Sequence, residues 1–221
     1  MNTEQARFNM IEQQIRPWDV LDKHVLELLS IVKREDFCPP AYNALAFVDM
    51  EVPLGDLALG QCMLAPRVEA RLLQDLALHK HETVLEVGTG SGHMAALLGH
   101  RASRVISYEL DAKLAGQARI NLQKAGVTNV EIIHGDGAQA ASWHGGPFDA
   151  IVLSGSVAEV PQALLAQLKV GGRLAAIVGD EPVMRATFVT RTGADEYRTT
   201  SPWDTMAPRL SSFVAPSRFR F

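Results

Sequence analysis

The stretch "LEVGTGSGH", residues 85–93, decides the fold. It follows a short apolar run and places three glycines, Gly88, Gly90 and Gly92, at alternate positions among small hydroxyl-bearing residues. Glycine has no Cβ, so the chain can turn tightly here and a ligand can approach the backbone closely. A helix that begins near Gly92 would offer unpaired N–H groups in its first turn. The stretch therefore predicts a strand, a ligand-binding turn and a helix in succession.

From residue 83 onward, the sequence alternates between two kinds of pattern. Apolar runs predict strands at residues 83–87, 104–109, 129–136, 148–155 and 173–179. Helical patterns fill residues 92–100, 111–126 and 160–172, and the last of these ends in a pair of glycines. Such alternation predicts an α/β fold with a Rossmann-like, doubly wound, mostly parallel sheet. Two later β-like runs, 185–192 and 196–201, predict a C-terminal hairpin at the edge of that sheet.

The residues before this core have a different character. Apolar residues at helical spacing predict helices over residues 3–31, with a break at Pro17. Residues 34–67 hold four prolines and are expected to be mostly loop with short strands, and a further helix is expected over 68–78. We therefore divide the chain into an N-terminal helical and loop extension at 1–80 and a core at 81–221, packed together as one compact unit.

Composition excludes several classes of function. The formal net charge of the 221 residues is -4 and no basic block offsets it, which argues against a nucleic-acid partner or an anionic membrane. The two cysteines, Cys38 and Cys62, cannot form a disulfide framework and fit no zinc motif, so we expect a reducing compartment and no metal. The polar start and the lack of an apolar run of about 18 residues predict a cytoplasmic protein without membrane contact.

Three carboxylates stand near the ends of the first three strands of the core. Glu86 lies within the first, Glu109 ends the second and Asp136 ends the third. Ligands of open α/β sheets bind beyond the carboxyl ends of the strands, so Glu109 could accept both hydroxyls of a ribose and Asp136 an adenine amino group. A dinucleotide fingerprint would need a later glycine or alanine where His93 stands, and no lysine follows the glycines as a phosphate-binding loop would require.

These features together resemble class I methyltransferases, which bind S-adenosyl-L-methionine (SAM). The segments "LEVGTGSG", "SYELD", "HGDG", "PFDAIVLSG" and "LKVGGRL" match the motifs of those enzymes in order. The resemblance implies SAM as the cofactor, S-adenosyl-L-homocysteine as the product and no metal. The residues that it assigns to the cofactor are Glu86, Gly88, Thr89, Gly90, Ser91, Gly92, Glu109, Leu110, Asp136, Gly137 and Ser154.

A narrower resemblance extends to the N-terminal side. "VKREDFCPPAYNALAFVDMEVPLG", "LGQCMLAPRV" and "GPFDAIVLSGSVAEVPQALLAQLKVGGRLAAIVG" are similar to the protein-L-isoaspartate O-methyltransferase family over roughly residues 10–180. This resemblance implies transfer of a methyl group to the carboxylate of isoaspartyl residues in damaged proteins or peptides. It also adds Ala65 and Pro66 to the cofactor-binding residues and makes residues 60–66 a substrate loop.

The substrate loop departs from the family pattern. The family carries Thr-Ile-Ser before Ala-Pro, whereas this chain has Cys62, Met63 and Leu64, so that Leu64 takes the place of the serine. His93 stands where the family has tyrosine, and the tail over residues 201–221 does not match the family's ending. The catalytic residues therefore stay open, with Gln61, Cys62 and Asp49 as the candidates.

The chemistry leaves the acceptor open as well. A carboxylate is already ionised at pH 7 and needs no base, so the protein has only to align the reacting atoms and exclude water, which can contribute roughly 7–11 kcal/mol. An amine or phenol would need a base, for which His93, His134 and Asp49 are the candidates. The alternatives to isoaspartyl methylation are transfer to another acceptor, such as a small molecule, and a SAM-binding module without catalysis.

Overall fold

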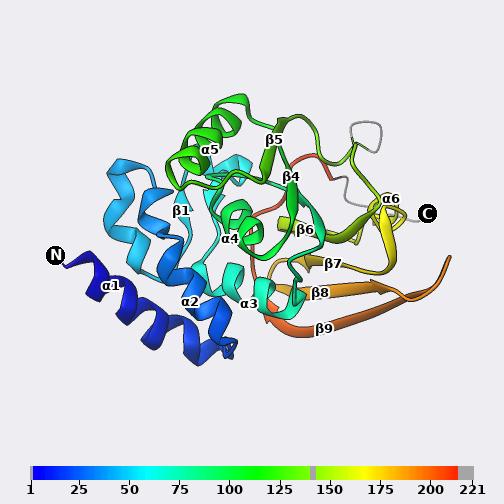
Figure 1. The fold of residues 1–221 in the computed structure, drawn as a ribbon, viewed down its shortest axis with the longest axis horizontal. Helices are drawn as coiled ribbons and strands as arrows, with labels where there is room; N and C mark the ends of the chain where they lie inside the picture. Colours follow the sequence, from blue (N-terminus) through cyan, green and yellow to red (C-terminus); the bar gives the residue numbers. More distant parts are fainter. Residues whose placement is uncertain (1, 140–142, 214–221) are drawn as a thin grey trace.

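The computed structural model describes residues 2–139 and 143–213 (Figure 1). Among these residues, a seven-stranded sheet has the strand order β5-β4-β3-β6-β7-β8-β9. The strands are β3 (Thr83–Val87), β4 (Arg104–Glu109), β5 (Val130–His134), β6 (Phe148–Val157), β7 (Leu168–Asp180), β8 (Val183–Arg191) and β9 (Tyr197–Thr205). The first five run parallel, and β8 and β9 join them antiparallel. This arrangement confirms the predicted α/β class and the edge hairpin.

The strand order changes direction between β3 and β6. From β3 the chain moves outward to β4 and β5, and it then returns to the other side of β3 with β6 and β7. The carboxyl ends of β3 and β6 therefore form the switch point at which open α/β sheets bind their ligands.

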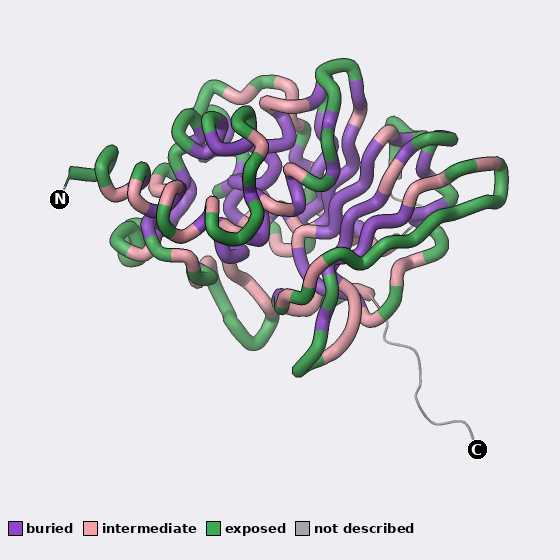
Figure 2. Tube along the Cα trace, turned by 90° about the horizontal axis from the view of Figure 1, so that it is seen from below, coloured by how far each residue is buried: buried purple, intermediate pink, exposed green. Residues whose placement is uncertain are grey.

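Three long helices pack on one face of the sheet. They are α3 (Pro66–Leu76), α4 (His93–Arg101) and α5 (Ala112–Lys124), and their buried residues join those of the N-terminal segment in one hydrophobic cluster. A second, smaller cluster on the other face is covered mainly by Leu164, Leu165 and the partly buried Leu210 and Phe213. In Figure 1, α1 and α2 lie to the left of the sheet and α6 to its right. Figure 2 shows the central strands buried; in the hairpin, β8 is mostly buried and the outer strand β9 is largely exposed.

The helix predicted over residues 160–172 is wrong in its length. The structure has a single turn, α6 (Gln162–Leu165), and β7 begins at Leu168. Gly171 and Gly172 lie inside β7, at a point where its register against β6 shifts. Gly171 has a φ of +85°, and a Cβ on Gly172 would come within 3.0 Å of the carbonyl oxygens of Phe148 and Asp149. Glycines that can end a helix also suit a strand irregularity, so the local pattern favoured the wrong element.

The N-terminal extension is helical up to Pro17, as predicted. Helix α1 (Thr3–Met10) continues through one π-helical stretch, η1 (Ile11–Ile15), and the short 3-10 helix η2 (Arg16–Trp18), and α2 (Lys23–Ile31) follows. The side chains of Asn2 and Asp22 accept backbone N–H groups at the starts of α1 and α2. Such N-terminal caps pair donors that the helix itself leaves unsatisfied.

Residues 32–66, all of them described, form short elements around one buried arginine. The predicted short strands are β1 (Val52–Pro53) and β2 (Cys62–Met63), which pair antiparallel. Three 3-10 helices, η3 (Arg34–Asp36), η4 (Pro40–Phe47) and η5 (Leu57–Leu59), were not predicted. The Arg34 guanidinium is 2% exposed and donates to the carbonyl oxygens of Ala46, Met50 and Leu64 at 3.0–3.2 Å. This side chain therefore fixes the path of the loop that leads to Leu64.

The larger hydrophobic cluster contains residues from both sides of position 80, while the division of the chain at that position stays a prediction. None of the helices in the described part of the chain is long and apolar enough to cross a membrane.

Candidate active site

A cavity of about 90 Å³ lies at the carboxyl ends of β3 and β6, and we call it the central cavity. Its walls come from the glycine loop, the ends of β4 and β6, residues 136–138, the loop at 59–64 and the tail at 208–213. Segments that are far apart in the sequence thus converge on the switch point of the sheet.

The glycine loop is fastened to the end of β4 by one carboxylate. Gly88, Gly90 and Gly92 have backbone φ values of +95°, +53° and +86°, which residues other than glycine rarely adopt. Glu109 accepts the N–H of Gly90 at 2.8 Å through one carboxylate oxygen and the N–H of Asp111 at 3.0 Å through the other. Burial raises the pKa of Glu109, and these N–H groups oppose that shift. The loop therefore reaches a defined position before any ligand binds.

Glu86 lies beneath the central cavity and not on its wall. It has no exposed surface and accepts hydrogen bonds from Ser107 at 2.6 Å and Ser154 at 2.7 Å. The Ser107 hydroxyl is also 2.6 Å from that of Thr89. Burial raises the pKa of Glu86 to about 8, so this carboxyl group is mostly protonated at pH 7. It links β3 to β4 and β6 and positions Ser154, which does line the cavity.

The structure brings most of the expected cofactor residues to the central cavity, but not all. Those on its wall are Gly88, Gly90, Glu109, Leu110, Asp136, Gly137 and Ser154, and they are joined by the catalytic candidates Gln61 and Cys62 and by Leu64, which replaces the family serine. Thr89 and Ser91, within the glycine loop, are buried and do not line the cavity. Gly92 directly precedes the first residue of α4. Ala65 faces a second hollow of about 850 Å³, and the buried Pro66 begins α3.

None of the three candidate bases lines the central cavity as the described residues define it. His93 is buried, with its Nδ1 2.8 Å from the carboxylate of Glu69. His134 is exposed at the end of β5. Asp49 lies in the second hollow, where it forms an ion pair with Arg67 at 2.6 Å.

Cys62 is held as a neutral thiol. Its Sγ hydrogen-bonds the carboxylate of Glu51, and burial together with that negative charge raises the pKa of Cys62 to about 12. The thiolate is the nucleophilic form of cysteine, so this environment opposes a nucleophilic role for Cys62 at pH 7. Leu64, two residues further on, lines the same wall and offers no hydroxyl group.

Sequence reasoning missed the tail as part of the site. The carbonyl of Pro208 accepts the N–H of Ser156 at 2.7 Å, and the N–H of Leu210 donates to the carbonyl of Ser156 at 2.9 Å. Leu210 covers the glycine loop so closely that a Cβ on Gly88 would lie 2.9 Å from its Cδ2 atom. No spacing motif marks this segment, and only its apolar residues among polar ones signal that it packs against the sheet. The rest of the tail, residues 214–221, lies outside the described residues.

A family model for protein-L-isoaspartate(D-aspartate) O-methyltransferase matches residues 5–205. The chain belongs to this methyltransferase family. A family member from Koribacter versatilis is 38% identical over 194 residues, which cover 88% of this chain and 85% of that protein. Another from Methanoculleus marisnigri is 40% identical over 173 residues, covering 78% of this chain and 77% of the relative.

A solved structure of the same family shares the fold. It is described as a protein-L-isoaspartate O-methyltransferase from Plasmodium falciparum in complex with S-adenosyl-L-homocysteine. Its TM-score is 0.76 at 20% sequence identity, and the match covers 95% of this chain and 98% of that one. The isoaspartate methyltransferase family match ends at residue 205, so the tail at 207–213 lies beyond it.

Proposed function

We propose that this chain is a SAM-dependent methyltransferase that esterifies the carboxylate of isoaspartyl residues in proteins and peptides. The observation that carries the proposal is the glycine loop at the switch point, fastened by Glu109 and followed at the next strand end by Asp136. Family membership supports the reaction, and the S-adenosyl-L-homocysteine complex of the Plasmodium falciparum protein supports the cofactor.

The residues around the central cavity fit SAM. Glu109 offers acceptors for the ribose hydroxyls, and Asp136 offers one for the adenine amino group. A Cβ on Gly88 would approach the Ser154 carbonyl within 3.2 Å, so only glycine leaves this part of the wall free for the methionine part. When bound, SAM supplies a methyl group that its sulfonium already activates.

The site favours an acceptor that is ionised before it arrives. Among the described residues, the wall of the central cavity carries no histidine, and its cysteine stays protonated. A carboxylate needs no base, so the protein has only to hold one oxygen in line with the methyl group and to exclude water. The tail and the loop at 59–64 both line the cavity, and the Ser211 hydroxyl donates to the Leu59 carbonyl at 3.3 Å, so together they can serve that purpose.

We also place the protein in the cytoplasm. Both cysteines, Cys38 and Cys62, are free thiols, and burial raises the pKa of each of them. Free thiols are typical of proteins in a reducing compartment.

A methyl-transfer assay tests the proposed function. Radiolabelled SAM is supplied with a peptide that contains one isoaspartyl residue, and with the same peptide containing a normal aspartyl residue. We expect methyl ester only on the isoaspartyl peptide, and loss of the signal in the variant Glu109→Ala. Transfer to neither peptide by a protein that binds SAM would refute the isoaspartyl proposal and favour another acceptor.

A further inference from the structure

With Leu64 in place of the family serine, the acceptor end of the site lacks one hydroxyl donor. An isoaspartyl acceptor carries a negative charge that has to be held beside the methyl donor, and Leu64 cannot donate a hydrogen bond to it. Another hollow, of about 520 Å³, adjoins the central cavity on this side, and the two share Leu59, Gly60, Pro208, Arg209 and Ser211. We call it the adjoining hollow, and a peptide that reaches the methyl donor can pass through it.

Arg209 is the single cationic side chain among the described residues that line the central cavity and the adjoining hollow. The other charged residues there are acidic: Glu109 and Asp136 in the first, and Glu51 and Glu181 in the second. Carboxylates repel an incoming carboxylate, so Arg209 is the one attractive charge on these described walls, and it is already ion-paired with Asp180 at 2.7 Å.

The guanidinium of Arg209 is held on one side only. Its Nη2 donates to the carbonyl of Gly179 and to the carboxylate of Asp180, each at 2.7 Å. Its Nη1 is buried and has no hydrogen-bond partner among the residues that the structure describes. Buried donors are nearly always paired in folded proteins, so a charged one without a partner calls for an explanation. Its backbone is fixed as well, by a bridge to Ser156.

We propose that Arg209 binds the carboxylate of the acceptor and so takes over the task of the missing serine hydroxyl. The inference rests on the proposed function and names the residue that selects its substrate. Guanidinium groups suit carboxylates because they offer several donors in one plane. Arg209 also lies beyond residue 205, where the match to the family model ends.

The test compares Arg209→Met, which keeps much of the side-chain length, with Arg209→Lys, which keeps the charge. A matched control is Arg185→Met, because Arg185 forms an exposed ion pair with Asp204 at 3.0 Å and lines neither cavity. We expect Arg209→Met to raise KM for an isoaspartyl peptide roughly ten- to hundredfold, in line with a lost charged hydrogen bond. Arg209→Lys should lose less, and the control should match the unmodified protein.

The effect on kcat separates this role from a general disturbance. Methyl transfer neutralises the carboxylate, so Arg209 stabilises the bound substrate at least as much as the transition state. We therefore expect kcat to change by less than about threefold while KM rises, which is the pattern of lost substrate binding. The affinity for S-adenosyl-L-homocysteine should stay within about twofold.

A neutral peptide gives the sharpest readout. With S-adenosyl-L-homocysteine bound, the dissociation constant is measured for the isoaspartyl peptide and for its counterpart with a carboxamide in place of that carboxylate. Arg209→Met should weaken only the acidic peptide. Equal weakening of both peptides would show that Arg209 merely shapes the tail, and an unchanged KM would also overturn the inference. Either of these results would leave the proposed function intact. If the unmodified protein methylates no isoaspartyl peptide, the proposed function and the role of Arg209 are both refuted.

The substrate loop supplies an independent check. The double change Cys62→Thr with Leu64→Ser restores the hydroxyl groups of the family pattern. If Arg209 now does the work of the serine, this double change should raise kcat/KM more in the Arg209→Met background than in the unmodified chain. Such non-additivity is expected of groups that act on the same atom. Equal gains in both backgrounds would contradict the inference.

Discussion

At the scale of single residues, Glu109 has two tasks that the sequence could not separate. It faces the central cavity, and its two oxygens also accept the N–H groups of Gly90 and Asp111. A residue with both tasks should be more sensitive to substitution than one that only touches the ligand.

The first prediction concerns Glu109. Hydrogen bonds to a charged group contribute about 1.5–3 kcal/mol each, so Glu109→Ala should weaken SAM binding by about tenfold to a few hundredfold. Glu109→Gln should lose less, because its amide oxygen can still accept from one of the two backbone N–H groups. Calorimetric titration measures the SAM affinity of the two variants. The control is Glu131→Gln, on the exposed end of β5. A loss below twofold in both variants would leave Glu109 without a role in binding.

The second prediction concerns Gly90. A valine there should abolish SAM binding in a folded protein, because its side chain would enter the cavity and a Cβ would already lie 3.2 Å from Leu54. Gly126 is the matched control, since its φ of +70° imposes similar strain while a Cβ there meets nothing within 4 Å. Both variants should unfold at lower temperature, and only Gly90→Val should lose the cofactor. Normal SAM affinity in folded Gly90→Val would rule out this loop as the binding site.

At the scale of elements, Glu86 joins three strands through two serines. Its pKa of about 8 in the folded protein lies well above the ordinary value of 4.5. As the pH rises from about 4.5 to 8, the unfolded chain releases this proton while the folded chain keeps it. The free energy of unfolding therefore falls through that window and levels off above it.

The third prediction follows from this sign. Glu86→Gln has no proton to release, so the stability of the variant relative to the unmodified protein should increase steadily between pH 5 and pH 8. Urea unfolding at several pH values measures the difference, in which the other titrating groups cancel. Parallel stability curves for the two proteins would mean that Glu86 titrates normally.

Elements whose pattern is local could be predicted from the sequence. Strands β3, β4 and β6 are short apolar runs, and the glycines after β3 mark the turn, so the switch point could be placed in advance. The pair Gly171 and Gly172 misled because a positive φ suits a helix end and a strand irregularity alike. Only the neighbouring β6 decides between them.

The site shows the same limit. The cofactor side follows from motifs at fixed spacing, and most of those residues do line the central cavity. The tail could not be placed, because Leu210 and Arg209 reach the cavity only through the pairing of their backbone with Ser156. That contact joins residues that are far apart in the sequence, so no local pattern reports it.

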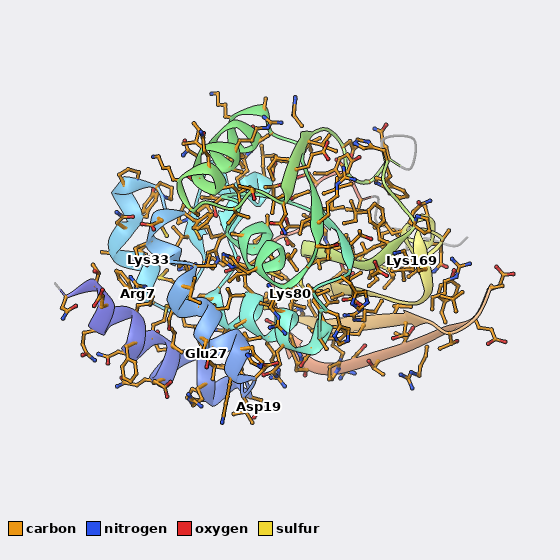
Figure 3. All side chains as sticks on the ribbon, in the orientation of Figure 1. Arg7, Asp19, Glu27, Lys33, Lys80 and Lys169 are labelled. Carbon is orange, nitrogen blue, oxygen red and sulfur yellow. The ribbon has the colours of Figure 1, made fainter. Side chains whose placement is uncertain are left out.

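At the scale of the whole molecule, charge is spread rather than gathered. In Figure 3 the labelled cationic side chains Arg7 and Lys33 lie on the left of the molecule, Lys80 near its centre and Lys169 on its right. The net charge is -4, and the cavity walls carry more carboxylates than cations. Proteins that bind nucleic acid instead present a basic face.

The fourth prediction is that the protein does not bind RNA or DNA at physiological salt. Fluorescence anisotropy with labelled single- and double-stranded oligonucleotides should show no saturation in the micromolar range. Binding that weakens steeply as salt is added would reveal phosphate contacts, and it would reopen the choice of acceptor.

The tail over residues 207–213 also bears on how the gene tolerates damage. A protein truncated by a stop codon directly after Thr205 would keep every strand of the described sheet, so it should still fold. It would nevertheless lose the partners of Ser156, the cover over Gly88 and the guanidinium at the acceptor end. Such an allele would pass a test for soluble protein and fail a test for activity, so screens that score abundance alone would overlook it.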